Sequence, residues 1–200
     1  MPQETPPKTR WHQLLGKLLE EWLTPVGITV QTDVPVTSEP TKADILLLRN
    51  SAKHWNAAQK ARLPDGIRES HASYILIEFK YSESVNKDAF LQTLSYDTLY
   101  RRTQRLKPMQ LQSFIVSAKT CQQETLDTFG YVQSDHQGVY HSDNPLLRDV
   151  GLILLNELSE AAHNAPIKCF ASQKAEQQKA FRSINQNLKK LPVGMERLIR

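Results

Sequence analysis

The sequence predicts an α/β protein built on a mixed β-sheet that is flanked by helices. Apolar residues recur at helical spacing in residues 10–23 and 87–102, which predicts two amphipathic helices. Short runs of β-branched and aromatic residues, typical of strands, lie at 28–36, 43–49, 73–81 and 111–118. Strands separated by helices indicate a sheet with helices packed on it. The predicted order is therefore α-β-β-β-α-β, followed by a smaller C-terminal α/β elaboration.

The limits of the first elements follow from local signals. The helix at 10–23 carries an apolar stripe, and the Thr-Pro pair before Gly27 ends it. Residues 52–63 form either a helix or an ordered excursion. The Pro-Asp-Gly sequence at 64–66 then predicts a turn before the third strand.

The second half of the chain predicts further, smaller elements. Asn144-Pro145 predicts the start of a helix at 146–158, because proline suits the first helical turn. The other predicted elements are a helix at 122–128, a strand at 131–140, a short strand at 167–170 and a polar helix at 172–190.

Positive charge is concentrated at the C-terminal end of the chain. The 200 residues carry a net charge of +4. Residues 161–200 hold eight Lys and Arg against two Glu, so this part is basic while the remainder is slightly acidic. Basic segments can neutralise phosphates, but they are also common on solvated surfaces.

Several classes of protein are excluded because their patterns are missing. No apolar run reaches the roughly 18 residues of a membrane span, and no signal region is present, so we expect a cytoplasmic protein. The phosphate loop of ATPases, the glycine pattern of dinucleotide enzymes and the Gly-x-Ser-x-Gly of serine hydrolases are absent. Cys121 and Cys169 fit no zinc spacing and are predicted to be buried or half-buried thiols. The six histidines are predicted to be surface or loop residues.

The third predicted strand is the segment most informative about function. Side chains alternate across a strand, so Glu78 and Lys80 point to one face and Phe79 to the other. Asp44 begins the preceding strand, and its carboxylate can converge with Glu78 if the two strands are neighbours. A divalent cation would bind both acids and relieve their repulsion. We therefore predict a Mg²⁺ site, with Mn²⁺ as a substitute, at which Lys80 acts on a metal-bound water or on the phosphate charge.

Asp44, followed after thirty-three residues by Glu78-Phe79-Lys80, resembles the PD-(D/E)xK nuclease superfamily. Gln92 and Tyr96 lie four residues apart on one helix face and resemble the Gln-x-x-x-Tyr motif of its RecB-like members. The resemblance covers about residues 10–118. It implies a restriction-endonuclease-like core in the α-β-β-β-α-β order. It also implies that Gln92 and Tyr96 help to hold the metal site and the nucleic-acid strand.

The sequence departs from the family pattern before Asp44, where the usual proline is missing. Many members also place a metal-contacting Glu on the first helix. Glu21 lies at the edge of the apolar stripe and is the favoured candidate here, whereas Glu20 lies nearly opposite. Both glutamates are explained at least as well as ordinary solvated charges on a helix, with no role at the metal.

Together these residues predict a Mg²⁺-dependent nuclease that hydrolyses DNA with a metal-activated water. The chain divides into a loose leader at 1–9, a nuclease-like domain at 10–160 and a basic, mainly helical extension at 161–200. The expected partner is nucleic acid, with DNA favoured, and no association with a membrane is expected. A homodimer or a partner protein stays open, as does the choice of DNA or RNA, of strandedness, and of internal or terminal cleavage.

Two rival hypotheses remain. The first is a catalytically silent nuclease-like domain that binds nucleic acid or a protein. The second is a small α/β protein whose Glu78–Lys80 pair is only structural, and a large separation between Asp44 and Glu78 would support it.

Overall fold

The computed structural model of the chain describes residues 11–35, 42–49 and 54–186. Its helices are α1 (Trp11–Leu23), η1 (Thr24–Val26), α2 (Ala57–Lys60), α3 (Lys87–Thr103), η2 (Pro108–Gln110), α4 (Gln123–Thr128), α5 (Ala165–Lys168) and α6 (Lys174–Gln186). Its strands are β1 (Ile28–Pro35), β2 (Lys42–Arg49), β3 (Tyr74–Lys80), β4 (Leu111–Ser117), β5 (Tyr131–Gln133), β6 (Val139–Ser142) and β7 (Val150–Leu154).

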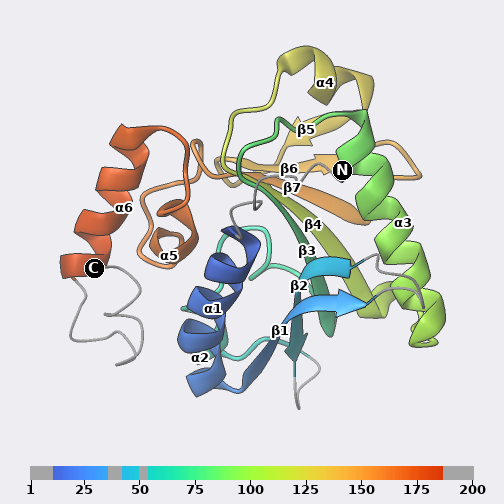
Figure 1. Cartoon of the computed structure of the whole chain (residues 1–200), viewed down its shortest axis with the longest axis horizontal. Helices are drawn as coiled ribbons and strands as arrows, with labels where there is room; N and C mark the ends of the chain where they lie inside the picture. The colour runs from blue at the N-terminus through green and yellow to red at the C-terminus, as the bar shows by residue number, and fades with distance from the viewer. Residues whose placement is uncertain (1–10, 36–41, 50–53, 187–200) are drawn as a thin grey trace, which may run out of the picture.

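The strands form one mixed sheet in the order β1-β2-β3-β4-β7-β6-β5 (Figure 1). The three central strands β3, β4 and β7 run parallel to one another. The strands on either side pair antiparallel. Parallel neighbours need a crossover connection, and α3 supplies the one between β3 and β4.

Helices cover both faces of this sheet (Figure 1). On one face, residues of α1, α5 and α6 share an apolar cluster with Ile45 and Ile77 of the sheet. On the other face, Phe90 of α3 and Leu126 of α4 share a cluster with Ile115 of β4. Because side chains alternate along a strand, the odd-numbered residues of β2 and β3 face α1 and the even-numbered ones face α3.

Polar contacts fix α3 against the sheet. Its first turn is capped by Asn86, whose side chain accepts a hydrogen bond from the N–H of Ala89 at 3.0 Å. Asp97 is buried and accepts hydrogen bonds from the Ser113 hydroxyl on β4 at 2.8 Å and from Arg101 at 2.7 Å. Burial raises the pKa of Asp97 in spite of these partners. The position of α3 along β4 is therefore set by a buried charge with specific donors.

The first six predicted elements are confirmed. They correspond to α1, β1, β2, β3, α3 and β4, with ends that differ by at most one residue, and residues 10 and 36 lie outside the described ranges. The expectation of an α/β protein with a mixed sheet flanked by helices is thus confirmed. The predicted segments at 52–63 and 172–190 contain α2 and α6. Residues 52–53 and 187–190, like the predicted leader at 1–9, lie outside the described ranges.

The predicted helix at 146–158 is wrong, because this segment contains β7. All five residues of β7 are buried between β4 and β6. A strand that is buried on both faces reads as a continuous apolar run, and periodicity does not distinguish such a run from a buried helix. Asn144-Pro145 begins a turn instead, in which the N–H of Leu147 donates to the carbonyl of Asn144 at 2.9 Å.

Two shorter predictions also need correction. The strand predicted at 167–170 is wrong, because α5 and the turn after it occupy this segment, with Pro166 in the first helical turn. The single strand predicted at 131–140 is the hairpin of β5 and β6. Its turn contains Gly138, whose φ of 73° favours glycine.

Both cysteines are buried and unpaired, as predicted. Burial raises the pKa of Cys169 to about 12, so this thiol stays protonated at neutral pH. Among the helices of the described ranges, none has the length and apolar character to cross a membrane.

We expect Gly138→Ala to destabilise the protein more than Gly27→Ala. Both glycines have a positive φ, of 73° and 76°, which costs an alanine about 1 kcal/mol. A Cβ on Gly138 would also lie 2.6 Å from the backbone nitrogen of Leu158, whereas one on Gly27 would meet no atom of the described residues within 4 Å. Urea denaturation should therefore show a loss of about 1 kcal/mol for Gly27→Ala and roughly 2 kcal/mol more for Gly138→Ala. Equal losses would contradict the close approach at Gly138.

Candidate active site

The pairing of β2 with β3 brings two predicted site residues together. The strands are antiparallel, with Ile45 opposite Ile77. Continuing this register puts Asp44 opposite Glu78. Opposite residues of an antiparallel pair share a face, with Cβ atoms about 5 Å apart. The large separation of Asp44 and Glu78 that would have supported a purely structural Glu78–Lys80 pair is therefore not observed.

The two carboxylates are held in different ways. Asp44 is half-buried, and its Oδ2 accepts a hydrogen bond from the N–H of Phe79 at 2.8 Å. Glu78 is only 4% exposed, and its Oε1 accepts a hydrogen bond from Nζ of Lys80 at 2.8 Å. The second oxygen, Oε2, is buried without a hydrogen-bond partner among the residues that the structure describes. A buried carboxylate oxygen in this state is a vacant ligand atom beside a second acid.

Lys80 connects the strand to α3. Its side chain is 11% exposed, and its Nζ donates to Glu78 and, at 3.0 Å, to Oε1 of Gln92. Nε2 of Gln92 in turn donates to the hydroxyl oxygen of Tyr96 at 2.6 Å. The residues of the predicted Gln-x-x-x-Tyr pattern thus join one hydrogen-bonded chain with Lys80. This chain fixes the ammonium group next to the carboxylates.

The electrostatics of the site are dominated by burial. Desolvation and the nearby charge of Asp44 raise the pKa of Glu78 to about 7, although Lys80 acts in the opposite direction. Burial also lowers the pKa of Lys80, but the attraction of Glu78 outweighs it and raises the pKa overall. Lys80 is therefore a stable cation, whereas Glu78 holds its proton weakly near neutral pH. A cation in contact with both acids would lower the pKa of Glu78 and drive that proton off.

A cleft of about 430 Å³ lies over these side chains. Asp44, Glu78, Lys80 and Gln92 line its floor from the sheet and α3. Its other walls come from the first turn of α1 and from the segment after β3, through Trp11, His12, Tyr81, Ser82 and Glu83. The cleft is polar, open to solvent and large enough for a phosphodiester group.

Asp33 ties the first turn of α1 to the sheet. Its carboxylate lies 3.3 Å from Nε2 of His12 and accepts a hydrogen bond from Gln13 at 2.9 Å. The register of β1 on β2 places Asp33 opposite Asp44. The residue has φ of 53°, a left-handed conformation that Asp tolerates better than most residues. This irregular strand position therefore helps to hold His12 over the cleft.

The structure does not bring Glu21 or Glu20 to the cleft. Both lie near the C-terminal end of α1, and Glu21 is about 14 Å along the helix axis from His12. Trp11 and His12, from the opposite end of the helix, line the cleft instead. The hydrophobic stripe indicates which face of α1 is buried, but it does not indicate which end reaches the site. For the same reason, no signal in the sequence separates His12 from the histidines predicted to be surface residues.

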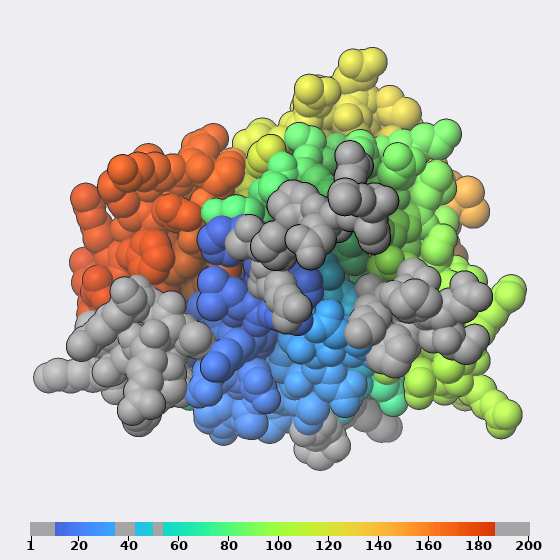
Figure 2. Space-filling model, in the orientation of Figure 1, coloured from blue at the N-terminus to red at the C-terminus, as the bar shows by residue number. Residues whose placement is uncertain are grey.

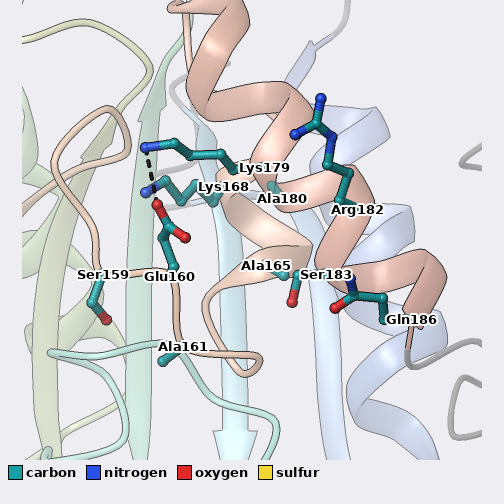
Figure 3. A pocket seen from close by; sticks show the side chains of 10 residues that line it. All are labelled: Ser159, Glu160, Ala161, Ala165, Lys168, Lys179, Ala180, Arg182, Ser183 and Gln186. Atoms are coloured by element: carbon teal, nitrogen blue, oxygen red, sulfur yellow. Dashed lines mark ion pairs between the residues drawn. The ribbon is translucent and has the colours of Figure 1, made fainter.

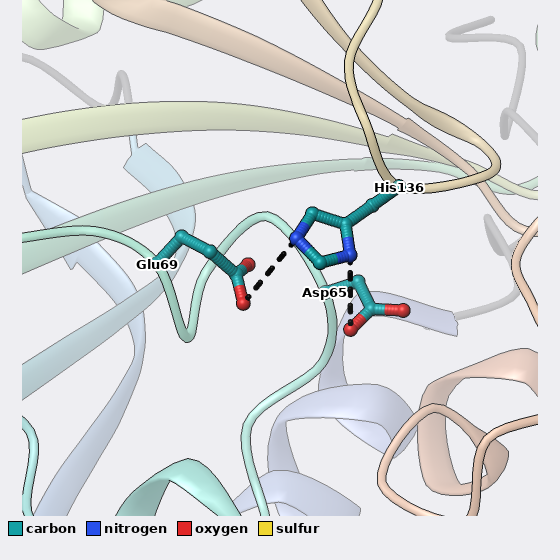
Figure 4. Close-up of side chains that lie close together, drawn as sticks. All are labelled: Asp65, Glu69 and His136. Atoms are coloured by element: carbon teal, nitrogen blue, oxygen red, sulfur yellow. Dashed lines mark ion pairs between the residues drawn. The ribbon is translucent and has the colours of Figure 1, made fainter.

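A second group of ligand-type side chains lies outside the cleft (Figure 4). Asp65, Glu69 and His136 offer atoms within 4.8 Å of one another, so this group could hold a metal ion. The two ring nitrogens of His136 face different acids, one 3.8 Å from Asp65 and the other 3.8 Å from Glu69 (Figure 4). The spacing of these residues in the sequence does not predict the group, because His136 comes from the β5–β6 turn, far from the two acids in sequence.

Protein groups already surround Asp65. One carboxylate oxygen lies 2.6 Å from Nε2 of His163, and the other accepts from Asn164 at 2.7 Å and from Ser159 at 3.1 Å. Although burial opposes it, this set of donors holds the pKa of Asp65 well below its usual range. Arg68 adds a positive charge 3.9 Å from Asp65. The hydrogen bonds and charges around Asp65 therefore join the loop at 64–69 to the segment before α5.

A third polar site is a pocket of about 270 Å³ next to α5 and α6 (Figure 3). Lys168 is buried there, donates to the carbonyl of Leu158 and pairs with Glu176 at 2.7 Å. Lys179 pairs with Glu160 at 2.9 Å (Figure 3). It also pairs with Glu176 at 2.9 Å. Acids of the protein thus neutralise both lysines, and the cleft over Asp44 and Glu78 is the stronger candidate for chemistry.

The chain matches no protein-family model, no curated protein and no solved structure.

We expect Glu78→Gln to stabilise the metal-free protein at pH 8 but not at pH 4. The pKa of Glu78 is raised from 4.5 to about 7, so the folded protein keeps a proton that the unfolded chain has lost. The stability linked to this proton is complete below about pH 4.5 and disappears as the pH rises through about 7. Glutamine does not ionise, so the variant should avoid a loss of about 2–3 kcal/mol.

The measurement is urea denaturation in EDTA across this pH range. Glu124→Gln, at an exposed position of α4, is the matched control and should follow the wild-type profile. The same pH profile for Glu78→Gln and the wild type would contradict the raised pKa.

Proposed function

We propose that this chain is a metal-dependent nuclease of the PD-(D/E)xK type, with a restriction-endonuclease-like core, that hydrolyses phosphodiester bonds in DNA. The observation that carries the proposal is the buried Oε2 of Glu78, which has no hydrogen-bond partner in the described part of the chain and lies beside Asp44. An unsatisfied carboxylate oxygen next to a second acid, in a cleft open to solvent, is suited to binding a cation.

Asp44 and Glu78 are the residues that would hold Mg²⁺, or Mn²⁺ in its place. Mg²⁺ prefers one or two carboxylates together with waters and phosphate oxygens, and the open cleft leaves space for both. When bound, such a cation polarises a phosphate oxygen and makes a coordinated water more acidic. Glu21 is not part of this proposal, because it lies far from the cleft.

Lys80 is the group that acts on the reacting atoms. It stays protonated, because the attraction of Glu78 raises its pKa. As a cation it can donate a hydrogen bond to the attacking water and stabilise the negative charge that builds on the phosphate. Its hydrogen bonds to Glu78 and Gln92 keep it in place before substrate arrives. Such preorganisation lowers the barrier without a rearrangement during the reaction.

Gln92 and Tyr96 are positioning residues in this proposal. Gln92 contacts Lys80 directly, and Tyr96 acts through Gln92. Gln92 also lines the cleft, so its amide can contact the substrate strand as well. The buried Asp97, one residue after Tyr96, holds this part of α3 on β4. The site thus depends on the packing of one helix on one strand.

We expect Lys80→Ala and Asp44→Asn to lower the rate of DNA cleavage by about 10²–10³-fold each, because each removes charge stabilisation or a cation ligand. The measurement is cleavage of labelled single-stranded, duplex and plasmid DNA with Mg²⁺ or Mn²⁺, and with EDTA as the metal-free reaction. The matched controls are Lys60→Ala and Asp143→Asn, which lie at exposed positions outside the cleft and should cut at the wild-type rate.

The outcomes separate the enzyme from a catalytically silent domain. Cleavage that needs a metal and both site residues supports the enzyme. A folded wild-type protein that cuts neither DNA nor matching RNA would contradict it and favour a catalytically silent domain that binds nucleic acid or a protein.

We expect the affinity for Mn²⁺ to rise about tenfold per pH unit below pH 7 and to level off above it. The cation needs the ionised form of Glu78, whose pKa is about 7 without metal. Electron paramagnetic resonance of free Mn²⁺ gives this affinity without any need for activity. Glu78→Gln should bind Mn²⁺ weakly at every pH. Unchanged binding in this variant would place the metal elsewhere, for example at the group of Asp65, Glu69 and His136.

A further inference from the structure

An apolar groove of about 250 Å³ lies beside the cleft, between α1 and α6. In the space-filling view α1 (blue) and the C-terminal segment (orange) lie next to each other (Figure 2). The groove is lined by the side chains of Trp11, Leu14, Tyr81, Phe170, Gln177 and Phe181, among others. Leu14 is 38% exposed there, whereas Leu15 and Leu18 of the same helix are buried.

The groove and the cleft share one wall. Trp11 and Tyr81 line both, and their rings are stacked with centroids 4.1 Å apart and planes 21° apart. One side of this aromatic pair therefore faces the carboxylates and Lys80, and another side faces the apolar groove. A nucleotide whose phosphate lies in the cleft would have its own or the next base within reach of the groove.

The groove has few polar groups, but the side-chain amide of Gln177 could hydrogen-bond to a base. Gln177 is half-buried, and its side-chain amide makes no hydrogen bond within the described ranges. An amide offers both a donor and an acceptor, as the edge of a base does. Lys174 lies three residues before Gln177 and seven before Phe181, so it shares their helix face and adds a positive charge to that face.

We propose that the groove holds one unpaired base of the nucleic-acid strand whose phosphate lies in the cleft. The proposal rests on the nuclease function proposed above, and it adds a substrate class. The base would stack on the aromatic side chains and meet the amide of Gln177 at its edge. Bases paired within an intact duplex are not available to such a groove, so the substrate is single-stranded or locally unpaired.

A nucleobase fits these observations better than a protein segment does. The groove shares Trp11 and Tyr81 with a polar cleft that suits a phosphodiester, and Lys174 adds a positive charge to the face of α6 that lines the groove. Aromatic surfaces with one free amide favour a flat, polar-edged ring over an aliphatic side chain. The groove has room for a single ring system, whereas a stable protein interface needs a much larger surface.

The test is binding of labelled oligothymidylates to the full chain in EDTA, followed by fluorescence anisotropy. Each oligonucleotide carries an abasic residue at a different position. We expect one position at which the missing base weakens binding by roughly tenfold, with small effects elsewhere. This position-specific loss should shrink to about twofold in Phe181→Ala and in Gln177→Glu. Gln178→Glu is the matched control, because it carries the same charge change at an exposed neighbour on α6 and should keep the full loss.

The possible results of this binding experiment separate the base site from the nuclease function. A position-specific loss that disappears in both groove variants supports the proposal, and Gln177→Glu serves even where Phe181→Ala weakens the packing of α6. A flat abasic profile, or a loss that persists in both variants, overturns the base site. If metal-dependent cleavage continues in that case, the nuclease function stands. Failure to bind or cut any nucleic acid overturns both proposals.

Discussion

The antiparallel pairing of β2 with β3 is the constraint on which the candidate site depends. Ile45 lies opposite Ile77, and the same register sets Asp44 against Glu78. The N–H of Phe79 donates to the Asp44 carboxylate at the point where this pairing ends. A slip of one residue would send the even-numbered side chains of β2 to the α1 face and leave an apolar residue opposite Glu78. The apolar cores on both faces forbid such a slip, so the packing of the sheet also fixes the geometry of the acids.

The same packing buries the carboxylate of Glu78, and this burial lowers the stability of the folded protein. Glu78 is buried beside a second acid, and its pKa is raised to about 7 as a result. Lys80 offsets part of this cost through its hydrogen bond, but the second carboxylate oxygen has no partner in the described part of the chain. Natural sequences violate the rules of stable packing mainly where function requires it. This cost is therefore located where β3 ends, beside the cleft.

The sequence predicted this region well, because its signals are local. Alternation along β3 places Glu78 and Lys80 on the face of the sheet that α3 covers. The helical spacing of Gln92 and Tyr96 places both on one face of α3, where Gln92 reaches Lys80. Prediction fails where long-range packing decides. The run that forms β7 is apolar throughout, and only its position between β4 and β6 makes it a strand. The group around Asp65 is assembled by a turn and a loop distant in sequence, so no spacing indicates it.

The cleft lies at the N-terminal end of α1, and this explains both why Glu21 is absent from the cleft and why the apolar groove adjoins it. The helix runs across the sheet so that its first turn, not its last, reaches the cleft, and Asp33 holds that turn in place. The cleft consequently receives His12 and Trp11, and not the predicted Glu21. A neutral or positive side chain beside two carboxylates reduces repulsion toward a phosphate, which a third acid would increase. In the proposed base site, the indole of Trp11 would do what a carboxylate could not, because its ring joins the polar cleft to an apolar surface on which a base could stack.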